Sequence, residues 1–324
     1  MTATTVEPAA VPAGGPADEE RAARWTRVQG MLAKELRGRM RGARAFVVLA
    51  IYLFFLTGFT LLIYWLTKLS VSSNPTTPAG KPVFFGLVAF ELGLVCFLAP
   101  SFTAGVIAGE RERQSYDLLM TTPLPLPLVV GAKLFAALAY VFLLIVAALP
   151  LMGVAIFLGG VAPEEVAIAF LMICASALAF GTIGLCYSAW VRSTIAAAAL
   201  AYGTMLLPVV ALPIVFATVY SSLAVVLSGG NASAGAIAVA YYVGGFIASL
   251  NPFIAGGLTE LILSQNRSLF FFSMPGLSGS GTLYVVGPWI IYTVMALVVT
   301  VLFFLLALYL ARPARGVRRK RSRE

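Results

Sequence analysis

The chain has 324 residues, of which 60% are hydrophobic and only 11% are charged, and its formal net charge is +9. This composition, with a mean hydropathy of +0.95, predicts an all-α polytopic membrane protein with a single membrane domain rather than a soluble enzyme. The sequence contains no histidine, which excludes the most common general base, a frequent zinc ligand and the Ser-His dyad.

The first part of the chain is predicted to lie in the cytoplasm. Residues 1–20 are rich in Ala, Pro and Thr, lack the apolar stretch of a signal peptide, and predict a disordered tail. Residues 21–44 predict an interfacial amphipathic helix on the inner membrane face, because apolar residues recur there at spacings of three and four: Trp25, Val28, Leu32, Leu36 and Met40. The alternative is a solvated basic helix that only enforces topology. No pattern typical of nucleic-acid binding is present.

Six apolar segments are long enough to cross a hydrocarbon core of about 30 Å as helices. They comprise residues 45–67, 83–107, 128–158, 165–191, 194–227 and 283–311, within a membrane domain that spans 45–311. Eight Lys and Arg residues precede the first span, and seven follow the last, in the basic tail 312–324. The positive-inside rule therefore predicts an even number of spans in the cell (plasma) membrane, with both termini cytoplasmic.

Glu91 falls near the middle of the second span, where an ionisable side chain is by default a functional candidate. It could bind a cation, relay protons or contact a polar substrate. The alternative is a structural role as a protonated carboxyl group that is hydrogen bonded to a neighbouring helix. A secondary transporter that is driven by an ion gradient and uses Glu91 is thus one functional hypothesis.

The predicted cytoplasmic loop 108–127 contains a segment of unusual charge density, residues 110–117, which we call the charged segment. Its five charged residues are Glu110, Arg111, Glu112, Arg113 and Asp117. A solvated inner loop is the alternative to a partner contact, but the positive-inside rule gives no reason for the interleaved acids. The charged segment therefore predicts a docking surface.

The local pattern predicts how this loop is built. A helix through the charged segment would place Arg113 and Asp117, and also Glu112 and Tyr116, four residues apart, where they can interact. Thr121-Thr122-Pro123 would end this helix. The alternation of Pro123, Pro125 and Pro127 with leucines predicts an extended, stiff chain until the next span begins near Leu128.

The region before the last span predicts a hairpin. The apolar run from Ala236 to Leu250 has only 15 residues, and Asn251-Pro252 interrupts it before a second short run. A seventh full span would place the basic tail outside. We therefore expect a re-entrant helical hairpin that enters the outer leaflet and returns, within an external region 228–282.

In these residues the chain resembles the permease subunits of type-2 ATP-binding-cassette (ABC) exporters. The resemblance rests on Gly109 to Arg113, Tyr116, Leu118-Leu119, Thr122-Pro123-Leu124, Gly131-Ala132-Lys133, Pro150, Gly159-Gly160-Val161 and Asn251-Pro252-Phe253. With the six-span plan, it covers most of residues 21–311. Many members of the family carry Gly-Thr where this chain has Gln114-Ser115.

The resemblance implies a function and a set of roles. Two permease subunits, identical or different, would surround the translocation path among the membrane lipids and bind two separate ABC ATPase subunits, which hold ATP and Mg²⁺. This chain contains no phosphate-loop motif, so we expect it to be a non-enzymatic transport subunit without a cofactor. The ATPase-coupling residues would be Glu110, Arg111, Glu112, Arg113, Tyr116 and Asp117.

Spans two and five would line the path, and the hairpin with Asn251, Pro252 and Phe253 would close it from outside. A membrane anchor that docks an ATPase without transporting anything is a further alternative.

Overall fold

The computed structural model describes residues 30, 43–70, 79–114, 125–228, 234–266, 269–275 and 282–312. Within these residues, six helical segments are long and apolar enough to cross a membrane, which confirms the predicted all-α polytopic fold. The predicted tails and almost all of the predicted interfacial helix lie outside the described residues.

The order of elements follows the predicted spans closely. The helices and strands are α2 (Ala43–Ser70), α3 (Gly80–Glu112), α5 (Leu126–Phe157), α6 (Pro163–Trp190), α7 (Thr194–Leu206), the π-helix η2 (Leu207–Ala211), α8 (Leu212–Ser228), α9 (Ala234–Ser249), α10 (Pro252–Asn266), β1 (Phe271–Pro275), β2 (Thr282–Val286) and α11 (Pro288–Leu310). The fifth span thus consists of α7, η2 and the first part of α8.

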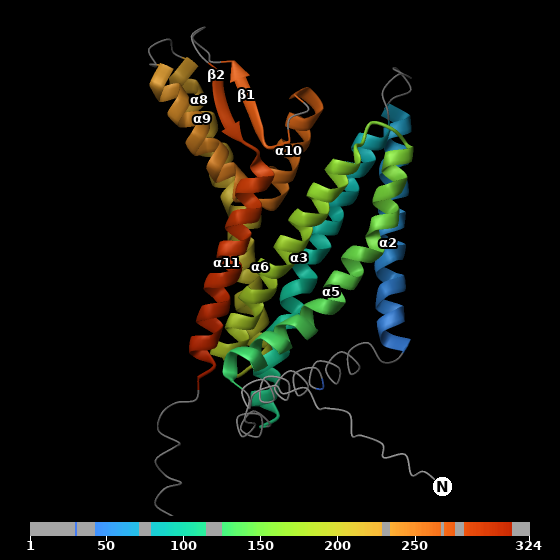
Figure 1. The fold of residues 1–324 in the computed structure, drawn as a ribbon, viewed down its shortest axis with the longest axis vertical. Helices are drawn as coiled ribbons and strands as arrows, with labels where there is room; N and C mark the ends of the chain where they lie inside the picture. Colours follow the sequence, from blue (N-terminus) through green and yellow to red (C-terminus); the bar gives the residue numbers. More distant parts are fainter. Residues whose placement is uncertain are drawn as a thin grey trace, which may run out of the picture.

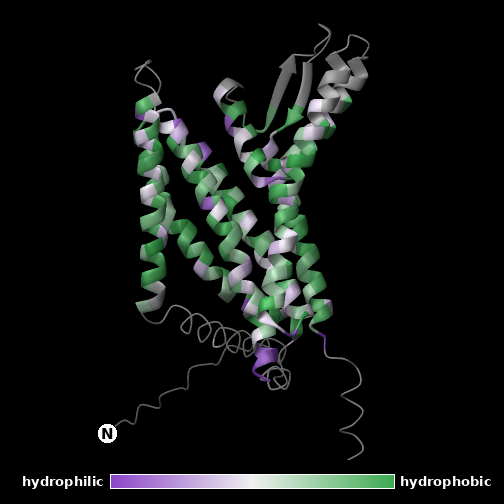
Figure 2. Cartoon of the chain, turned by 180° about the vertical axis from the view of Figure 1, so that it is seen from behind, coloured by the Kyte–Doolittle hydropathy of each residue, from purple (hydrophilic) through white to green (hydrophobic). Residues whose placement is uncertain are grey.

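The long helices run side by side, with α2 at one edge and α11 towards the other (Figure 1). Helix α6 is central, because it packs against α3, α5, α7 and α11. One end of the bundle, which we call the charged end, holds the end of α3 and the starts of α5 and α7. The opposite end, the hairpin end, holds α9, α10 and the β-strands (Figure 1). The long helices are coloured mainly as hydrophobic, with a hydrophilic patch at the charged end and smaller hydrophilic patches towards the hairpin end (Figure 2).

Close packing of α3 on α6 builds the core. A Cβ atom added to Gly184 of α6 would lie 3.1 Å from the backbone of Pro100 on α3 and 2.2 Å from the Thr103 hydroxyl. One turn earlier, a Cβ atom on Gly181 would lie 2.6 Å from a methyl group of Leu138 on α5. Glycine therefore permits the approach of three helices at this level, as small residues do between membrane helices.

The fifth span contains a π-helical turn that its prolines explain. Pro208 lies within η2, and Pro213 lies in the first turn of α8. The backbone N–H of Leu212 bonds to the carbonyl of Leu207, five residues earlier. Because Pro213 has no N–H, it cannot bond to the carbonyl oxygens four and five residues before it, which belong to Val209 and Pro208.

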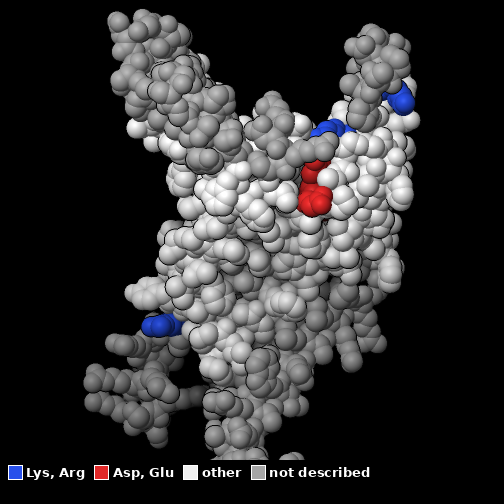
Figure 3. Space-filling view, turned by 45° about the horizontal axis from the view of Figure 1, so that its top comes forward, with Lys and Arg blue, Asp and Glu red and all other residues white. Residues whose placement is uncertain are grey.

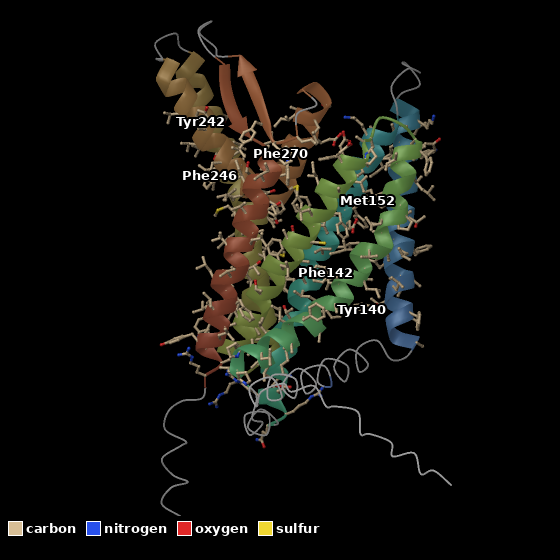
Figure 4. All side chains as sticks on the ribbon, viewed as in Figure 1. Tyr140, Phe142, Met152, Tyr242, Phe246 and Phe270 are labelled. Atoms are coloured by element: carbon tan, nitrogen blue, oxygen red, sulfur yellow. The ribbon has the colours of Figure 1, made fainter. Side chains whose placement is uncertain are left out.

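The hairpin end is more elaborate than the sequence predicts. Helices α9 and α10 form the predicted helical hairpin, with its turn at Leu250 and Asn251. The side chains of Tyr242 and Phe246 are exposed on α9 (Figure 4). An antiparallel pair of strands follows α10, with Phe271 opposite Val286. The prediction that the last span begins at residue 283 is wrong, because 282–286 form β2 and α11 begins at Pro288.

Candidate functional site

Helix α3 ends inside the charged segment. Its last residue is Glu112, and the Arg113 and Gln114 N–H groups bond to the carbonyls of Gly109 and Arg111 at 3.2 Å each. Gln114 has a φ of 56°, in the left-handed region that often terminates helices but favours glycine. The prediction of a continuous helix through residue 117 is therefore wrong.

The third span also begins earlier than predicted. Helix α5 starts at Leu126 rather than Leu128, with Pro125 in an extended conformation before it and Pro127 in its first turn. Proline is tolerated there because the first N–H groups of a helix have no intrahelical partner. The extended chain predicted from the prolines therefore ends two residues sooner.

Glu110 is joined to α5 by an ion pair with Lys133. The Lys133 side chain is 4% exposed and that of Glu110 is 25% exposed, so the pair lies largely away from water. A buried cation of this kind requires a partner, because an isolated ammonium group in an apolar surrounding is strongly destabilising. The last turn of α3 is thereby fixed to α5.

Arg111 and Glu112 connect the same turn to two further helices. The Arg111 guanidinium donates a hydrogen bond of 2.6 Å to the Ala189 carbonyl in the last turn of α6. The Glu112 carboxylate accepts the backbone N–H of Thr194 at 2.8 Å and its hydroxyl at 3.1 Å. Ser193, at the N-cap position of α7, makes no side-chain cap bond, so Glu112 supplies the cap from α3.

Three consecutive side chains at the end of α3 therefore bond to α5, α6 and α7 in turn. Glu110 and Glu112 thus have an intramolecular role in addition to the partner contact that was predicted for them. Arg113 is exposed, and Tyr116 and Asp117 lie outside the described residues.

Ser188 is a structural residue of this site that sequence reasoning missed. Its hydroxyl oxygen, on α6, accepts the backbone N–H groups of Ile107 and Ala108 on α3 at 2.9 Å each. The side chain is fully buried. A lone serine inside an apolar helix carries no pattern that would have indicated this contact.

Glu91 is fully buried on α3, and neither of its carboxylate oxygens has a hydrogen-bond partner among the described residues. The hydrogen bond to a neighbouring helix that the structural alternative requires is therefore absent from the described part of the chain. The buried Tyr52 hydroxyl on α2 is likewise without a hydrogen bond among the described residues. In this conformation Glu91 does not face an open path.

Asn251 joins the hairpin to the fifth span. Its side-chain amide donates hydrogen bonds of 2.7 Å to the Pro208 carbonyl and 3.0 Å to the Val209 carbonyl, the two oxygens that Pro213 cannot serve. Its side-chain oxygen accepts the N–H of Phe253 at 2.8 Å and of Ile254 at 2.9 Å, which caps α10. Asn251 is fully buried, so the tip of the hairpin is fixed inside the bundle.

Pro252 opens α10 as its first residue, a position where its fixed φ suits a helix. Pro252 is buried, and the ring of Phe253 reaches towards α3, where a Cβ atom on Gly93 would lie 4.0 Å from it. The three residues predicted to mark the hairpin are thus brought together at its tip, while the charged segment lies at the other end of the bundle.

The family model described as CcmB protein matches residues 27–256, more than two thirds of the chain. The chain belongs to the CcmB family. The match includes both the charged segment and the hairpin tip, and it ends before β1, β2 and α11. A comparison with curated proteins found no match.

CcmB proteins are permease components of ABC-type transporters, and the ATPase is a separate subunit. The chain is therefore an ABC permease subunit and a multi-pass membrane protein. Membership of this family favours an ABC permease over the secondary transporter that Glu91 suggested. The family also works with an ABC ATPase and a further partner protein.

Proposed function

We propose that this chain is the membrane-spanning subunit of a type-2 ABC exporter, which pairs with a second permease subunit and couples to its ATPases through the charged segment. One observation carries the proposal. Consecutive residues Glu110, Arg111 and Glu112 bond to α5, α6 and α7, so a displacement of the end of α3 would act on three helices together.

In the proposed mechanism, the exposed Arg113 and the residues that follow it face the ATPase at the end that we predict to be cytoplasmic. ATP and Mg²⁺ are bound by the ATPase, and its closure displaces the end of α3. Glu112 passes this displacement to α7 because it caps the first turn of that helix. The two permease subunits then change the side to which the path between them opens.

The contacts of Asn251 extend this linkage to the hairpin end. Helix α7 leads directly into η2, whose Pro208 and Val209 carbonyls are held by the Asn251 amide. Movement of the fifth span would therefore move the hairpin tip as well. This arrangement supports a hairpin that closes the path when the fifth span is in one position and opens it in the other.

For the cargo, we propose heme, because the family is described as the permease of a heme exporter. This part of the proposal rests on family membership. Transport of heme into inside-out vesicles that contain the chain and its ATPase would support it. ATP hydrolysis without any heme movement would favour a membrane anchor instead.

The coupling role predicts the behaviour of a double variant, Glu112→Ala with Arg113→Ala. We expect the variant to bind the ATPase more weakly and to lose most ATP-driven transport, because the cap on α7 and an exposed contact are both removed. Transport and stimulated ATP hydrolysis are measured together in reconstituted vesicles.

The matched control is Glu164→Ala, which removes an exposed acid from the first turn of α6 at the opposite end. Wild-type transport and stimulation in the Glu112→Ala/Arg113→Ala variant, with correct folding, would show that the charged segment does not couple the two subunits.

A further inference from the structure

An apolar pocket lies at the hairpin end, between α3, α6 and α10. Phe85 and Leu92 of α3, Met172 of α6, and Phe253 and Leu263 of α10 are among the side chains that line it. The hairpin tip thus supplies part of its wall. The pocket is separate from the charged segment, which lies at the other end of α3.

Three charged side chains gather at this pocket. The Lys81 ammonium lies 3.2 Å from a carboxylate oxygen of Glu260 and 3.8 Å from one of Glu165. Both glutamates line the pocket. The face drawn in Figure 3 carries few charges, and acidic and basic side chains lie next to each other on it.

Among the residues that the structure describes, the charges of this cluster do not balance, because two carboxylates share one ammonium group. Glu165 is only 8% exposed, and its Oε2 atom has no hydrogen-bond partner within the part of the chain that the structure describes. A buried carboxylate oxygen without a partner is destabilising, so the site favours an additional cationic donor. An anionic ligand would instead be repelled by the excess acid.

The depth of the pocket fits one membrane leaflet. Lys81 is in the first turn of α3 and Leu92 lies eleven residues further along, which corresponds to about 16 Å at a rise of 1.5 Å per residue. Half of a hydrocarbon core of about 30 Å has nearly the same thickness. A molecule with its polar head beside Lys81 could therefore extend an apolar tail to the level of Leu92.

We propose that this pocket binds a membrane lipid whose head carries a primary ammonium group, such as phosphatidylethanolamine. The ammonium group donates to Glu165 and Glu260, the phosphate accepts from Lys81, and an acyl chain fills the apolar part. Charge-assisted hydrogen bonds of this kind are about twice as strong as neutral ones. The bound lipid contacts Phe253 and holds the hairpin tip against α3 and α6.

Photolabelling of the full chain in complex with its ATPase tests this proposal. The complex is placed in nanodiscs without nucleotide, with phosphatidylethanolamine or phosphatidylglycerol of identical diazirine-bearing acyl chains, and labelled peptides are mapped by mass spectrometry. We expect about tenfold more labelling of the pocket by phosphatidylethanolamine, which corresponds to about 1.4 kcal/mol. Equal labelling by the two lipids would overturn the proposal.

Two sets of variants separate the head-group contacts from the apolar part. Glu165→Gln with Glu260→Gln keeps the shape of both side chains and is expected to abolish the preference between the lipids. Gly256→Leu is expected to abolish labelling, because Gly256 lines the pocket and has open space beside it. The control is Gly153→Leu on α5, which also has no atom within 4 Å of an added Cβ atom and does not line the pocket.

Unchanged labelling in Gly256→Leu, with Gly153→Leu behaving as wild type, would also contradict the proposal. Addition of heme discriminates a cargo site from a lipid site: loss of labelling on addition of heme would assign the pocket to cargo and refute the lipid assignment. Because the readout requires neither ATP nor transport, its failure would leave the proposed coupling function untouched.

Discussion

Replacement of Asn251 is expected to loosen the hairpin from the fifth span. Its side chain makes four hydrogen bonds, two to the Pro208 and Val209 carbonyls and two to the first N–H groups of α10. Asn251→Ala removes all four. Asn251→Ser keeps a good N-cap residue but cannot reach both carbonyl oxygens, so the two variants separate the cap from the contact with η2.

The expected loss of stability has two contributions, the cap on α10 and the hydrogen bonds to η2. Loss of an N-cap costs about 1 kcal/mol, and leaving a buried carbonyl unsatisfied costs about 1 kcal/mol or more. We therefore expect Asn251→Ala to destabilise the chain by about 3 kcal/mol and Asn251→Ser by about 2 kcal/mol. Pro213→Ala restores an N–H that can bond to Val209, so it should offset about 1 kcal/mol of the loss in the Ser background.

The assay is unfolding of the purified full chain by titration with sodium dodecyl sulfate, followed by circular dichroism. The four chains of the cycle are the wild type, Asn251→Ser, Pro213→Ala and the double variant. An Asn251→Ser variant as stable as the wild type would refute the role of the amide. If the effects of Asn251→Ser and Pro213→Ala on stability simply add, Pro213 is not the reason that the Asn251 amide is needed.

Further variants probe the other contacts, each by the same titration. Gln114 has a φ of 56°, a left-handed conformation that is strained for any residue with a Cβ atom, so Gln114→Gly should stabilise the chain by about 1 kcal/mol. A destabilised variant would show that this strain is not significant. Gly184→Ala should destabilise by about 2 kcal/mol through the clash with α3, whereas Gly203→Ala, which has open space on α7, should not; equal effects would exclude the clash. Lys133→Met should cost about 2 kcal/mol because it removes the ion pair that joins Glu110 to α5, and adding Glu110→Gln should recover part of it; no recovery would show that the pair contributes little.

The six spans could be predicted from the sequence because length and hydropathy alone decide whether a helix can cross a membrane. The predicted boundaries were wrong where a strand and the helix that follows it have the same composition. Residues 283–286 are as apolar as the helix that follows, so hydropathy merged β2 with α11, although Gly287-Pro288 marks the start of the helix. The five-residue strand β1 lies inside the predicted external region 228–282, for which no strand was expected.

The contacts of the candidate site could not be predicted from the sequence for a different reason. The charges of Glu110, Arg111 and Glu112 are evident in the sequence, but their partners lie between 23 and 82 residues away, on three other helices. Only the packing of those helices brings the partners together. Asn251-Pro252 could be identified as the hairpin turn, whereas the carbonyls of η2 that Asn251 binds lie 43 and 42 residues earlier in the chain.

The double hydrogen bond to Ser188 has a mechanical consequence. Because one hydroxyl holds two successive amides of α3, and Gly184 leaves no gap beside Pro100, α6 cannot slip along α3 without breaking several buried contacts at once. The apolar stretches of α2, the fifth span and α11 are only 17%, 17% and 22% buried, against 61% for α6. Shape change during a transport cycle is therefore expected at this less buried periphery, around an inner pair that moves as one piece.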